Sequence, residues 1–284
     1  MLNLHERFLD EDLPCFIPDG KVGILATIDG GNRPHLTLIT AMQALDTGHL
    51  VFGQFCDGSG KDNARARRKT GFLFMTLDKK LWRGKAIWRE ARKTGPEFEM
   101  FNQKPMWRYN AYFGIHTVHY LDLVGTTRRE NLPMGKIVSG VIASNLLPAK
   151  PNPHTSSEVE VMNSWTRMMV SKAGVLKFLA YIDNDGYPVI VPALSCRAVA
   201  TDSIVFPRAE YADEITLVPQ GPVALYAMAL SMETVMVKGM YTPAPRNSII
   251  KAGILLVDQV YNSMPPVPGL IYPQQPLDPV KEFS

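Results

Sequence analysis

Two stretches of the chain show the same succession of apolar and polar positions. Residues 25–39 begin as an apolar run, pass through a short polar turn and return as a second run, and residues 179–191 repeat this succession. The turns, Asp29-Gly30-Gly31-Asn32 and its counterpart at 183–186, are rich in Gly, Asn and Asp. These residues tolerate the backbone conformations of tight hairpins. The pattern therefore predicts a β-hairpin in each of two β-rich units.

The two stretches are related by a constant offset of 154 residues, which carries Pro34 onto Pro188. The same offset places Val51-Phe52 on Val205-Phe206 without a gap. Over residues 25–53 the two copies are identical at nine positions, where average composition would give roughly two. We therefore predict an internal duplication of a β-rich unit.

The first unit is expected to contain one helix among its strands. The run from Lys61 to Lys69 combines alanine with long, straight side chains, which favours a helix. Ser59 is the expected N-cap, and Thr70-Gly71 is expected to end the helix. The six expected strands of this unit are 22–28, 35–44, 50–55, 72–77, 81–88 and 115–124.

Proline-rich stretches and changes of pattern mark the expected domain boundaries. The prolines at 148, 151 and 153 indicate a linker, and a proline-rich tail extends from Pro265 to Pro279. The expected segments are an N-terminal arm (1–19), a first β-rich unit with its helical connection (20–147), a linker and helix (148–172), a second, degenerate β-rich unit (173–243) and a C-terminal segment (244–284).

Composition limits the compartment and the partners. A hydrophobic content of 46% and a charged content of 20% are those of a soluble globular protein. The net charge of +3 is too small to indicate a polyanion partner by itself, and the longest apolar runs are far shorter than a membrane span. Three cysteines far apart in the sequence indicate reduced thiols rather than disulfides. We therefore expect a cytoplasmic protein that binds neither membrane nor nucleic acid.

The basic run offers the clearest candidate chemistry. At 3.6 residues per turn, Lys61, Arg65 and Arg68 fall on one helical face. The N-terminus of a helix presents N–H groups and a positive dipole end to an anion, so Ser59, Lys61 and Arg65 are suited to a phosphate. A solvated helix face and a nucleic-acid patch are the alternative interpretations of the same residues.

The second copy differs at the corresponding place. It has Arg208, followed by Glu210, Asp213 and Glu214, instead of the basic helix. Because a carboxylate would repel a phosphate, we expect one phosphate site per chain, in the first unit.

Two other groups have plainer interpretations. His116 and His119 are three residues apart and would point to opposite faces of a strand, so we expect packed or exposed histidines rather than metal ligands. The aromatic residues from Trp107 to Phe113 are most simply part of a core. As an alternative, Trp107 and Arg108 would wall the edge of a flat ring.

The order of these motifs resembles the FMN-binding split barrels of the pyridoxamine 5′-phosphate oxidase-like family. Where the family's helix commonly ends in an Asn-Pro-Arg-like turn, this chain has Lys69-Thr70-Gly71. The segments that carry the resemblance are Ala26-Thr27-Ile28-Asp29, Arg33-Pro34-His35, Leu50-Val51-Phe52-Gly53 and Ser59-Gly60-Lys61.

The resemblance implies a fold and a cofactor site. The implied fold is mainly β, with two tandem split barrels that form a pseudo-dimer, and the implied cofactor is FMN. The phosphate of FMN would lie at the segment from Ser59 to Asn63. The flavin ring would lie along the two strands that contain residues 37–40 and 52–54. The implied cofactor-binding residues are Thr37, Leu38, Ile39, Thr40, Phe52, Gln54, Ser59, Gly60, Lys61, Asn63, Arg65, Trp107 and Arg108.

The function expected from this resemblance is a flavin-dependent oxidoreductase. The flavin would carry the redox chemistry, so the sequence identifies no catalytic residue. A small-molecule substrate or electron donor is the expected partner, and a homodimer is left open. The alternatives are a deazaflavin- or haem-binding relative and a non-enzymatic flavin carrier or sensor.

Overall fold

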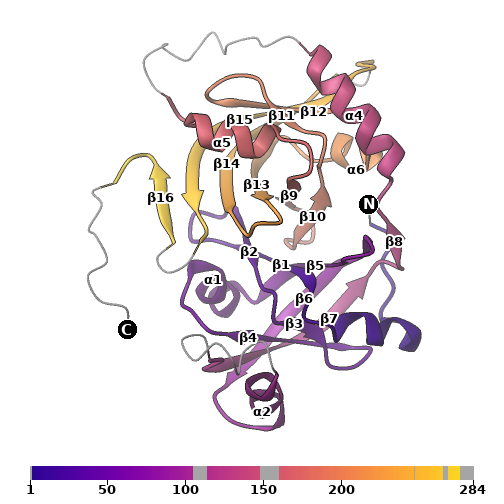
Figure 1. Cartoon of the computed structure of the whole chain (residues 1–284), viewed down its shortest axis with the longest axis vertical. Helices are drawn as coiled ribbons and strands as arrows, with labels where there is room; N and C mark the ends of the chain where they lie inside the picture. The colour runs from indigo at the N-terminus through magenta and orange to yellow at the C-terminus, as the bar shows by residue number, and fades with distance from the viewer. Residues whose placement is uncertain (1, 105–113, 148–159, 246, 265–267, 276–284) are drawn as a thin grey trace. The chain divides into compact units, whose positions relative to one another are not determined.

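The structure is a computed structural model that describes residues 2–104, 114–147, 160–245, 247–264 and 268–275 (Figure 1). The chain divides into two compact units. The N-terminal unit consists of Leu2–Leu132 together with Ile182–Ile190, and the C-terminal unit of Pro133–Tyr181 and Val191–Ser284. Among the helices of these described residues, none is long and apolar enough to cross a membrane.

The N-terminal unit is built on an eight-stranded antiparallel sheet, in the order β2-β1-β5-β6-β7-β4-β3, with β8 paired to β6. Among the described residues of this unit, the helices are the 3₁₀ helix η1 (Asp10–Phe16), α1 (Ser59–Arg67) and α2 (Pro96–Gln103). The strands are β1 (Lys21–Ile28), β2 (Pro34–Leu38), β3 (Met42–Ala44), β4 (His49–Gln54), β5 (Lys69–Thr76), β6 (Lys80–Arg92), β7 (Thr117–Thr126) and β8 (Glu130–Asn131).

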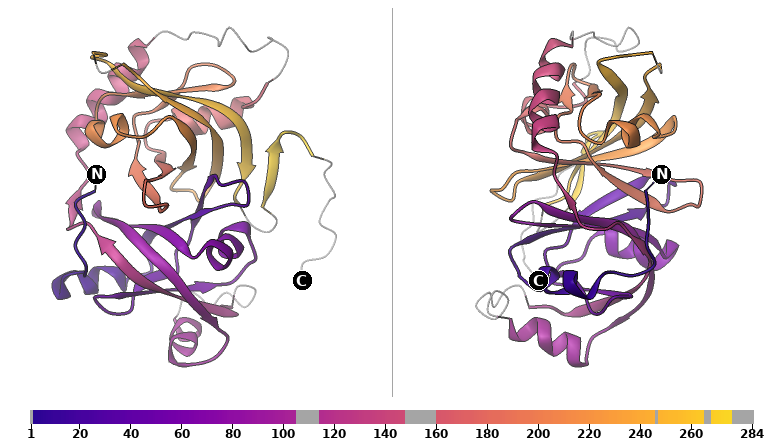
Figure 2. Two further views of the ribbon diagram at one scale, coloured as in Figure 1. Left: turned by 180° about the vertical axis from the view of Figure 1, so that it is seen from behind. Right: turned by 90° about the vertical axis from the view of Figure 1, so that its right-hand side faces the viewer.

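The C-terminal unit has a second eight-stranded antiparallel sheet, in the order β10-β9-β13-β14-β15-β12-β11, with β16 paired to β15. Its helices are α4 (Met134–Leu146), α5 (Ser164–Ser171) and α6 (Ala212–Thr216). The strands, which Figure 2 shows from two further sides, are β9 (Leu176–Ile182), β10 (Pro188–Pro192), β11 (Arg197–Ala198), β12 (Ser203–Pro207), β13 (Gly221–Met228), β14 (Thr234–Pro243), β15 (Lys251–Asn262) and β16 (Gly269–Tyr272).

The two sheets have the same strand order when β1–β7 are set against β9–β15. The expected mainly-β fold with two tandem β units is therefore confirmed. Each sheet path has seven strands rather than the six expected, because the single strand expected at 35–44 is divided into β2 and β3. The second sheet continues beyond residue 243, because β15 pairs with β14 and β12.

The repeated hairpins have the predicted construction. Pro34 and Pro188 are the first residues of β2 and β10, where a missing N–H does not interrupt a strand. In the first turn, Asp29 Oδ1 accepts from the backbone N–H groups of residues 31 and 33, at 2.9 Å each. In the second turn, Asp183 Oδ1 accepts from those of residues 185 and 187, at 3.0 Å each.

The core of the N-terminal unit is aromatic. The ring of Phe16 lies 4.9 Å from that of Phe8 and 4.9 Å from that of Trp82, measured between centroids. The indole N–H of Trp82 donates to Asp12 Oδ2 at 3.0 Å, which connects η1 to β6. The N-terminal segment that contains Phe8 and η1 packs against the sheet through these rings. Burial of the rings stabilises the folded unit.

Candidate functional site

The first feature of the candidate site is the start of α1. The structure makes Gly58 the N-cap, with extended backbone (φ 164°, ψ 149°), and no side chain caps the helix. The expectation that Ser59 is the N-cap is therefore wrong, because Ser59 is already the first helical residue. The opening N–H groups of a helix have no partner within the helix, so this end is suited to an anion.

The second feature is the close approach of α1 to β2. A Cβ placed on Gly60 would lie 2.2 Å from Thr37 Oγ1, so only glycine fits here. Thr37 Oγ1 is buried and has no hydrogen-bond partner among the described residues. Buried polar atoms are nearly always hydrogen-bonded. An unpartnered hydroxyl beside a helix N-terminus thus indicates a place for a polar ligand.

The third feature is a buried lysine. Lys61 is only 6% exposed, and its Nζ lies 3.9 Å from Cys56 Sγ. No carboxylate of the described residues is paired with it, since the ion pairs of α1 involve Arg65 and Asp62. Burying a charge is costly unless a counter-charge accompanies it. The residues at this end of α1 therefore fit an anionic group such as a phosphate.

The other polar residues of α1 point elsewhere. Asn63 Nδ2 is 3.5 Å from Thr27 Oγ1, and Arg65, with 43% of its side chain exposed, is 3.7 Å from Asp62. Arg68 follows the helix as its C-cap, at φ +59°, and its Nε donates to the carbonyl oxygen of Trp88 at 3.1 Å. The predicted face of Lys61, Arg65 and Arg68 is therefore wrong for Arg68, because the helix ends one residue earlier.

The strand segments expected along a ring are only partly exposed. Phe52 is fully buried, and its ring stacks on His119 with centroids 4.5 Å apart. Ile39 belongs to the hydrophobic core, whereas Leu38 and Thr40 are half-buried. Trp107 and Arg108 lie outside the described residues.

Gln54 is the most connected of the predicted residues. Its Oε1 is 2.7 Å from His119 Nε2, and its Nε2 donates to Asp57 Oδ1 at 2.9 Å. Trp88 Nε1 donates to His119 Nδ1 at 3.1 Å. The sequence alone does not identify His119 as part of a site, because its partners are 31 and 65 residues away along the chain.

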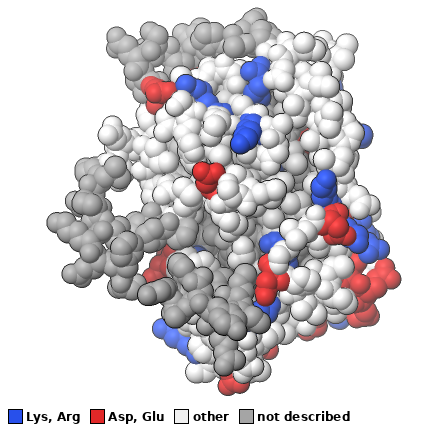
Figure 3. Space-filling model, viewed as in Figure 1, with Lys and Arg blue, Asp and Glu red and all other residues white. Residues whose placement is uncertain are grey.

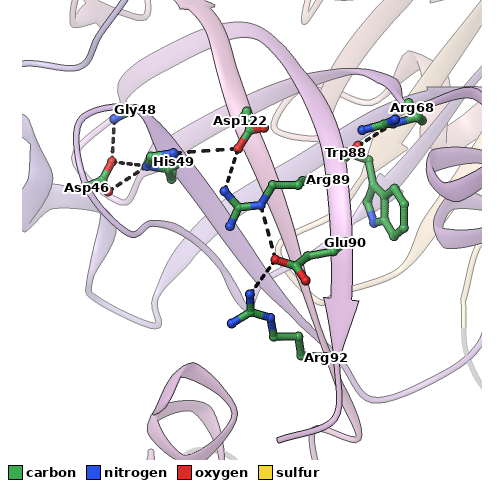
Figure 4. Close-up of polar contacts among 9 residues, drawn as sticks. All are labelled: Asp46, Gly48, His49, Arg68, Trp88, Arg89, Glu90, Arg92 and Asp122. Carbon is green, nitrogen blue, oxygen red and sulfur yellow. Dashed lines mark hydrogen bonds and ion pairs between the residues drawn. The ribbon is translucent and has the colours of Figure 1, made fainter. Parts of the chain in front are cut away.

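A surface network covers the neighbouring part of β6 and β7 (Figure 4). His49 lies between Asp46, at 2.8 Å, and Asp122, at 3.8 Å, and Arg89 contacts Asp122 at 3.2 Å. Arg92 is 2.7 Å from Glu90. These pairs are largely exposed, so each contributes little to stability, and they are separate from the buried Trp88–His119–Gln54 contacts.

The corresponding place in the C-terminal unit is occupied by a carboxylate. The 154-residue offset places Glu210, which is 1% exposed, on Cys56. Its two oxygens accept from the backbone N–H of Ser195 at 2.7 Å and from the Ser195 hydroxyl at 2.5 Å. Burial raises the pKa of Glu210, and the Ser195 bonds oppose the rise. Arg208 points away and donates to the Ser248 carbonyl oxygen at 2.8 Å.

The distribution of charge on one face, and of metal-ligating side chains among the described residues, was compared with that of other kinds of site. On the face drawn in Figure 3, basic and acidic side chains are interspersed, unlike the continuous basic area typical of nucleic-acid-binding proteins. Within the described ranges, no three His, Cys, Asp or Glu residues are grouped as metal ligands.

Comparison with known proteins gives a likeness in fold. No family model matches the chain, and no curated protein matches it. A putative pyridoxamine 5′-phosphate oxidase from Lactobacillus delbrueckii is 17% identical, with 43% of this chain and 94% of that chain covered and a TM-score of 0.35.

Two further solved structures are similar to the same degree. An FMN-binding protein from Syntrophomonas wolfei is 13% identical, with 39% of this chain and 77% of that chain covered and a TM-score of 0.33. An F420 reductase is 15% identical, with coverages of 41% and 94% and a TM-score of 0.33. The Lactobacillus delbrueckii protein carries the name of the family that the sequence resembles. An identity this low transfers no activity, so the function has to come from the residues of this chain.

Proposed function

We propose that the N-terminal unit binds FMN and that the chain is a flavin-dependent oxidoreductase. The observation that carries this proposal is the buried ammonium group of Lys61, which has no carboxylate partner among the described residues. It lies in the first turn of α1, next to the glycine that packs on the unpartnered hydroxyl of Thr37. A doubly charged phosphate would supply the missing counter-charge.

The phosphate fits this end of the helix on energetic grounds. A charge-assisted hydrogen bond to a buried group contributes about 1.5–3 kcal/mol. Lys61 would supply one such bond, and Ser59 and Thr37 would supply hydroxyl groups. Arg65 is half-exposed and engaged with Asp62, so it would contribute mainly through its charge.

The strand residues would hold the ring. Thr37 and Leu38 at the end of β2, and Thr40 just after it, are partly exposed, and Gln54 ends β4 next to the loop that leads into α1. A bound flavin supplies the redox chemistry. The part of these protein residues is to bind and orient the ring and to exclude water, and none of them is assigned a proton-transfer role.

The C-terminal unit, on this proposal, descends from the same ancestral unit by duplication and has lost the site. The matching strand order and the matching Asp29 and Asp183 turns support a common origin. Glu210 supports the loss, because its buried carboxylate already accepts the donors of Ser195.

Flavin titration tests the proposal. Quenching of FMN fluorescence should give one site per chain, and Lys61→Ala should weaken binding about ten- to a hundredfold. Arg208→Ala, which removes the basic side chain of the corresponding segment in the other unit, is the control and should bind as the wild type does. Equal losses in both variants, or two sites per chain, would contradict the assignment.

The same preparation separates the alternatives. Bleaching of the bound flavin by NADH or NADPH would indicate an oxidoreductase, and a flavin that neither donor reduces would indicate a carrier or sensor. Preferential binding of a deazaflavin or haem would replace FMN as the cofactor.

A further inference from the structure

Four side chains in the N-terminal unit form one continuous line of hydrogen bonds. It runs from Trp88 on β6 to His119 on β7, then to Gln54 at the end of β4, and finally to Asp57 in the loop before α1. The three donor–acceptor distances are 3.1, 2.7 and 2.9 Å. We refer to these four residues as the relay.

The direction of every bond in the relay follows from its first member. An indole N–H can only donate, so His119 Nδ1 accepts. A neutral imidazole then carries its proton on Nε2, which donates to Gln54 Oε1. With its oxygen facing His119, the Gln54 amide turns its NH₂ group to Asp57, whose carboxylate accepts.

The imidazole is neutral at ordinary pH. His119 is fully buried, and burial, followed by the charges of Arg65, Lys61 and His116, lowers its pKa to about 3. A charged imidazolium would donate from both nitrogens and would leave the Trp88 donor without an acceptor.

The strand register holds the relay in place. Phe52 and His119 are directly opposite each other on β4 and β7, and their rings stack almost parallel, at 6°. Trp88 is opposite Leu121, two residues from His119, so both side chains lie on one face of the sheet. A register shift between Trp88 and Glu90 marks a β-bulge, a feature that re-aims side chains.

The relay also connects the two ends of α1. The backbone of Trp88 exchanges hydrogen bonds with Arg68, the C-cap of α1, at 2.8 and 3.1 Å (Figure 4). At the other end, Asp57 immediately precedes Gly58, the N-cap. The relay therefore connects the orientation of the Gln54 amide to α1, the helix whose N-terminus we propose as the phosphate site.

We propose that His119 is a positioning residue that fixes the polarity of Gln54, so that Gln54 presents an N–H donor to an acceptor edge of the flavin ring. This inference rests on the proposed function. One N–H of Gln54 is engaged by Asp57, and the other has no partner among the described residues. The ring atom that meets it must be an acceptor, namely a ring nitrogen or carbonyl oxygen. Without His119, the Gln54 oxygen loses its donor and Asp57 alone holds the amide, so its remaining N–H is less firmly aimed at the ring.

Nuclear magnetic resonance on the wild-type chain tests the relay without a substitution. Long-range ¹H–¹⁵N spectra distinguish a protonated from an unprotonated ring nitrogen. We expect His119 to be neutral at pH 7, with the proton on Nε2. A proton on Nδ1, or a charged imidazolium at pH 7, would overturn the inference.

Matched variants test the effect on the ring. His119→Leu should weaken FMN binding about tenfold, the equivalent of one neutral hydrogen bond. His119→Gln, which can donate and accept along the same line, should recover most of the affinity. His49→Gln, in the exposed pair with Asp46, is the control for the same substitution outside the relay and should leave the affinity unchanged.

Trp88→Phe provides a test that does not empty the His119 site. Without the indole donor, the His119 ring should no longer be held in one tautomer, so the spectra should show both ring nitrogens partly protonated. FMN binding should also be weaker. If the wild type binds FMN and His119→Leu or Trp88→Phe binds it equally well, the role of His119 is overturned and the proposed function stands. A wild type that binds no FMN overturns the proposed function, and this inference with it.

Discussion

Gly60 lies so close to Thr37 that a Cβ on the glycine would be 2.2 Å from the threonine hydroxyl oxygen and 3.1 Å from the threonine Cβ. The threonine is β-branched and stands on a strand, so it cannot turn away easily. This contact holds the N-terminus of α1 against the end of β2.

The first prediction is that Gly60→Ala displaces the start of α1. Overpacking of this kind costs about 1–3 kcal/mol, and we expect a lower melting temperature together with at least about tenfold weaker FMN binding. Thermal unfolding and flavin titration measure the two effects. Adding Thr37→Ala removes the clash at 2.2 Å but keeps the Cβ contact at 3.1 Å, so it should restore part of the melting temperature but not the affinity. Recovery of the affinity in the double variant would show that Thr37 has no part in binding.

The second prediction separates the two cations of α1. Lys61 is buried, whereas Arg65 is half-exposed and paired with Asp62, so Arg65→Ala should weaken FMN binding far less than Lys61→Ala. Salt should reduce the contribution of Arg65 more strongly, because exposed charges are screened. Titrations at low and high salt check this. A larger loss for Arg65→Ala would place the phosphate outside the buried end of the helix.

The third prediction concerns acid stability. Folding lowers the pKa of His119 to about 3, so the unfolded chain binds an extra proton between about pH 3 and pH 6.5. Stability should therefore fall as the pH falls through this window, by roughly 2 kcal/mol from His119 at pH 5. Denaturant unfolding at pH 7 and pH 5 measures the change. His119→Gln should flatten this dependence, and an unchanged slope would refute it.

The fourth prediction compares the two hairpin turns. Asp29→Ala and Asp183→Ala each remove an acceptor of two backbone N–H groups, and we expect a loss of about 1–3 kcal/mol in each. Asp183 also pairs with the mostly buried Lys85. Burial alone would lower the pKa of Lys85, but Asp183 and Asp185 raise it overall. Asp183→Ala should therefore cost more in the wild type than in a Lys85→Met background, which urea unfolding measures, and equal losses in the two backgrounds would count against a role for Lys85.

Local signals predicted the fold well. Turn residues and the prolines at 34 and 188 located both hairpins, because glycine, asparagine and proline restrict the backbone wherever they occur. The duplicated pattern anticipated two sheets of one topology. The extent of the second sheet was harder to predict, since β15 joins it through pairing with distant strands.

The site was less accessible to sequence reasoning. Helical periodicity placed Lys61, Arg65 and Arg68 together, but periodicity does not reveal which residue a neighbouring strand will bury, or that Arg68 will adopt a positive φ and bond to Trp88. His119 depends on Gln54 and Trp88, which only strand pairing brings near it. Such long-range relationships leave no mark in the spacing of residues along the chain.

On the proposed function, Glu210 stands in the C-terminal unit where the N-terminal unit would bind the phosphate of FMN. Its carboxylate is attached to the chain and satisfies Ser195 at all times, whereas the phosphate proposed for the N-terminal unit is present only when FMN is. A ligand at a hundred times its dissociation constant stabilises the folded state by about 2.7 kcal/mol. On the proposed function, FMN would stabilise the N-terminal unit in this way and not the C-terminal unit. Depletion of FMN should thus weaken the two units unequally, so that a chain starved of flavin begins to unfold, and to be degraded, from its N-terminal unit.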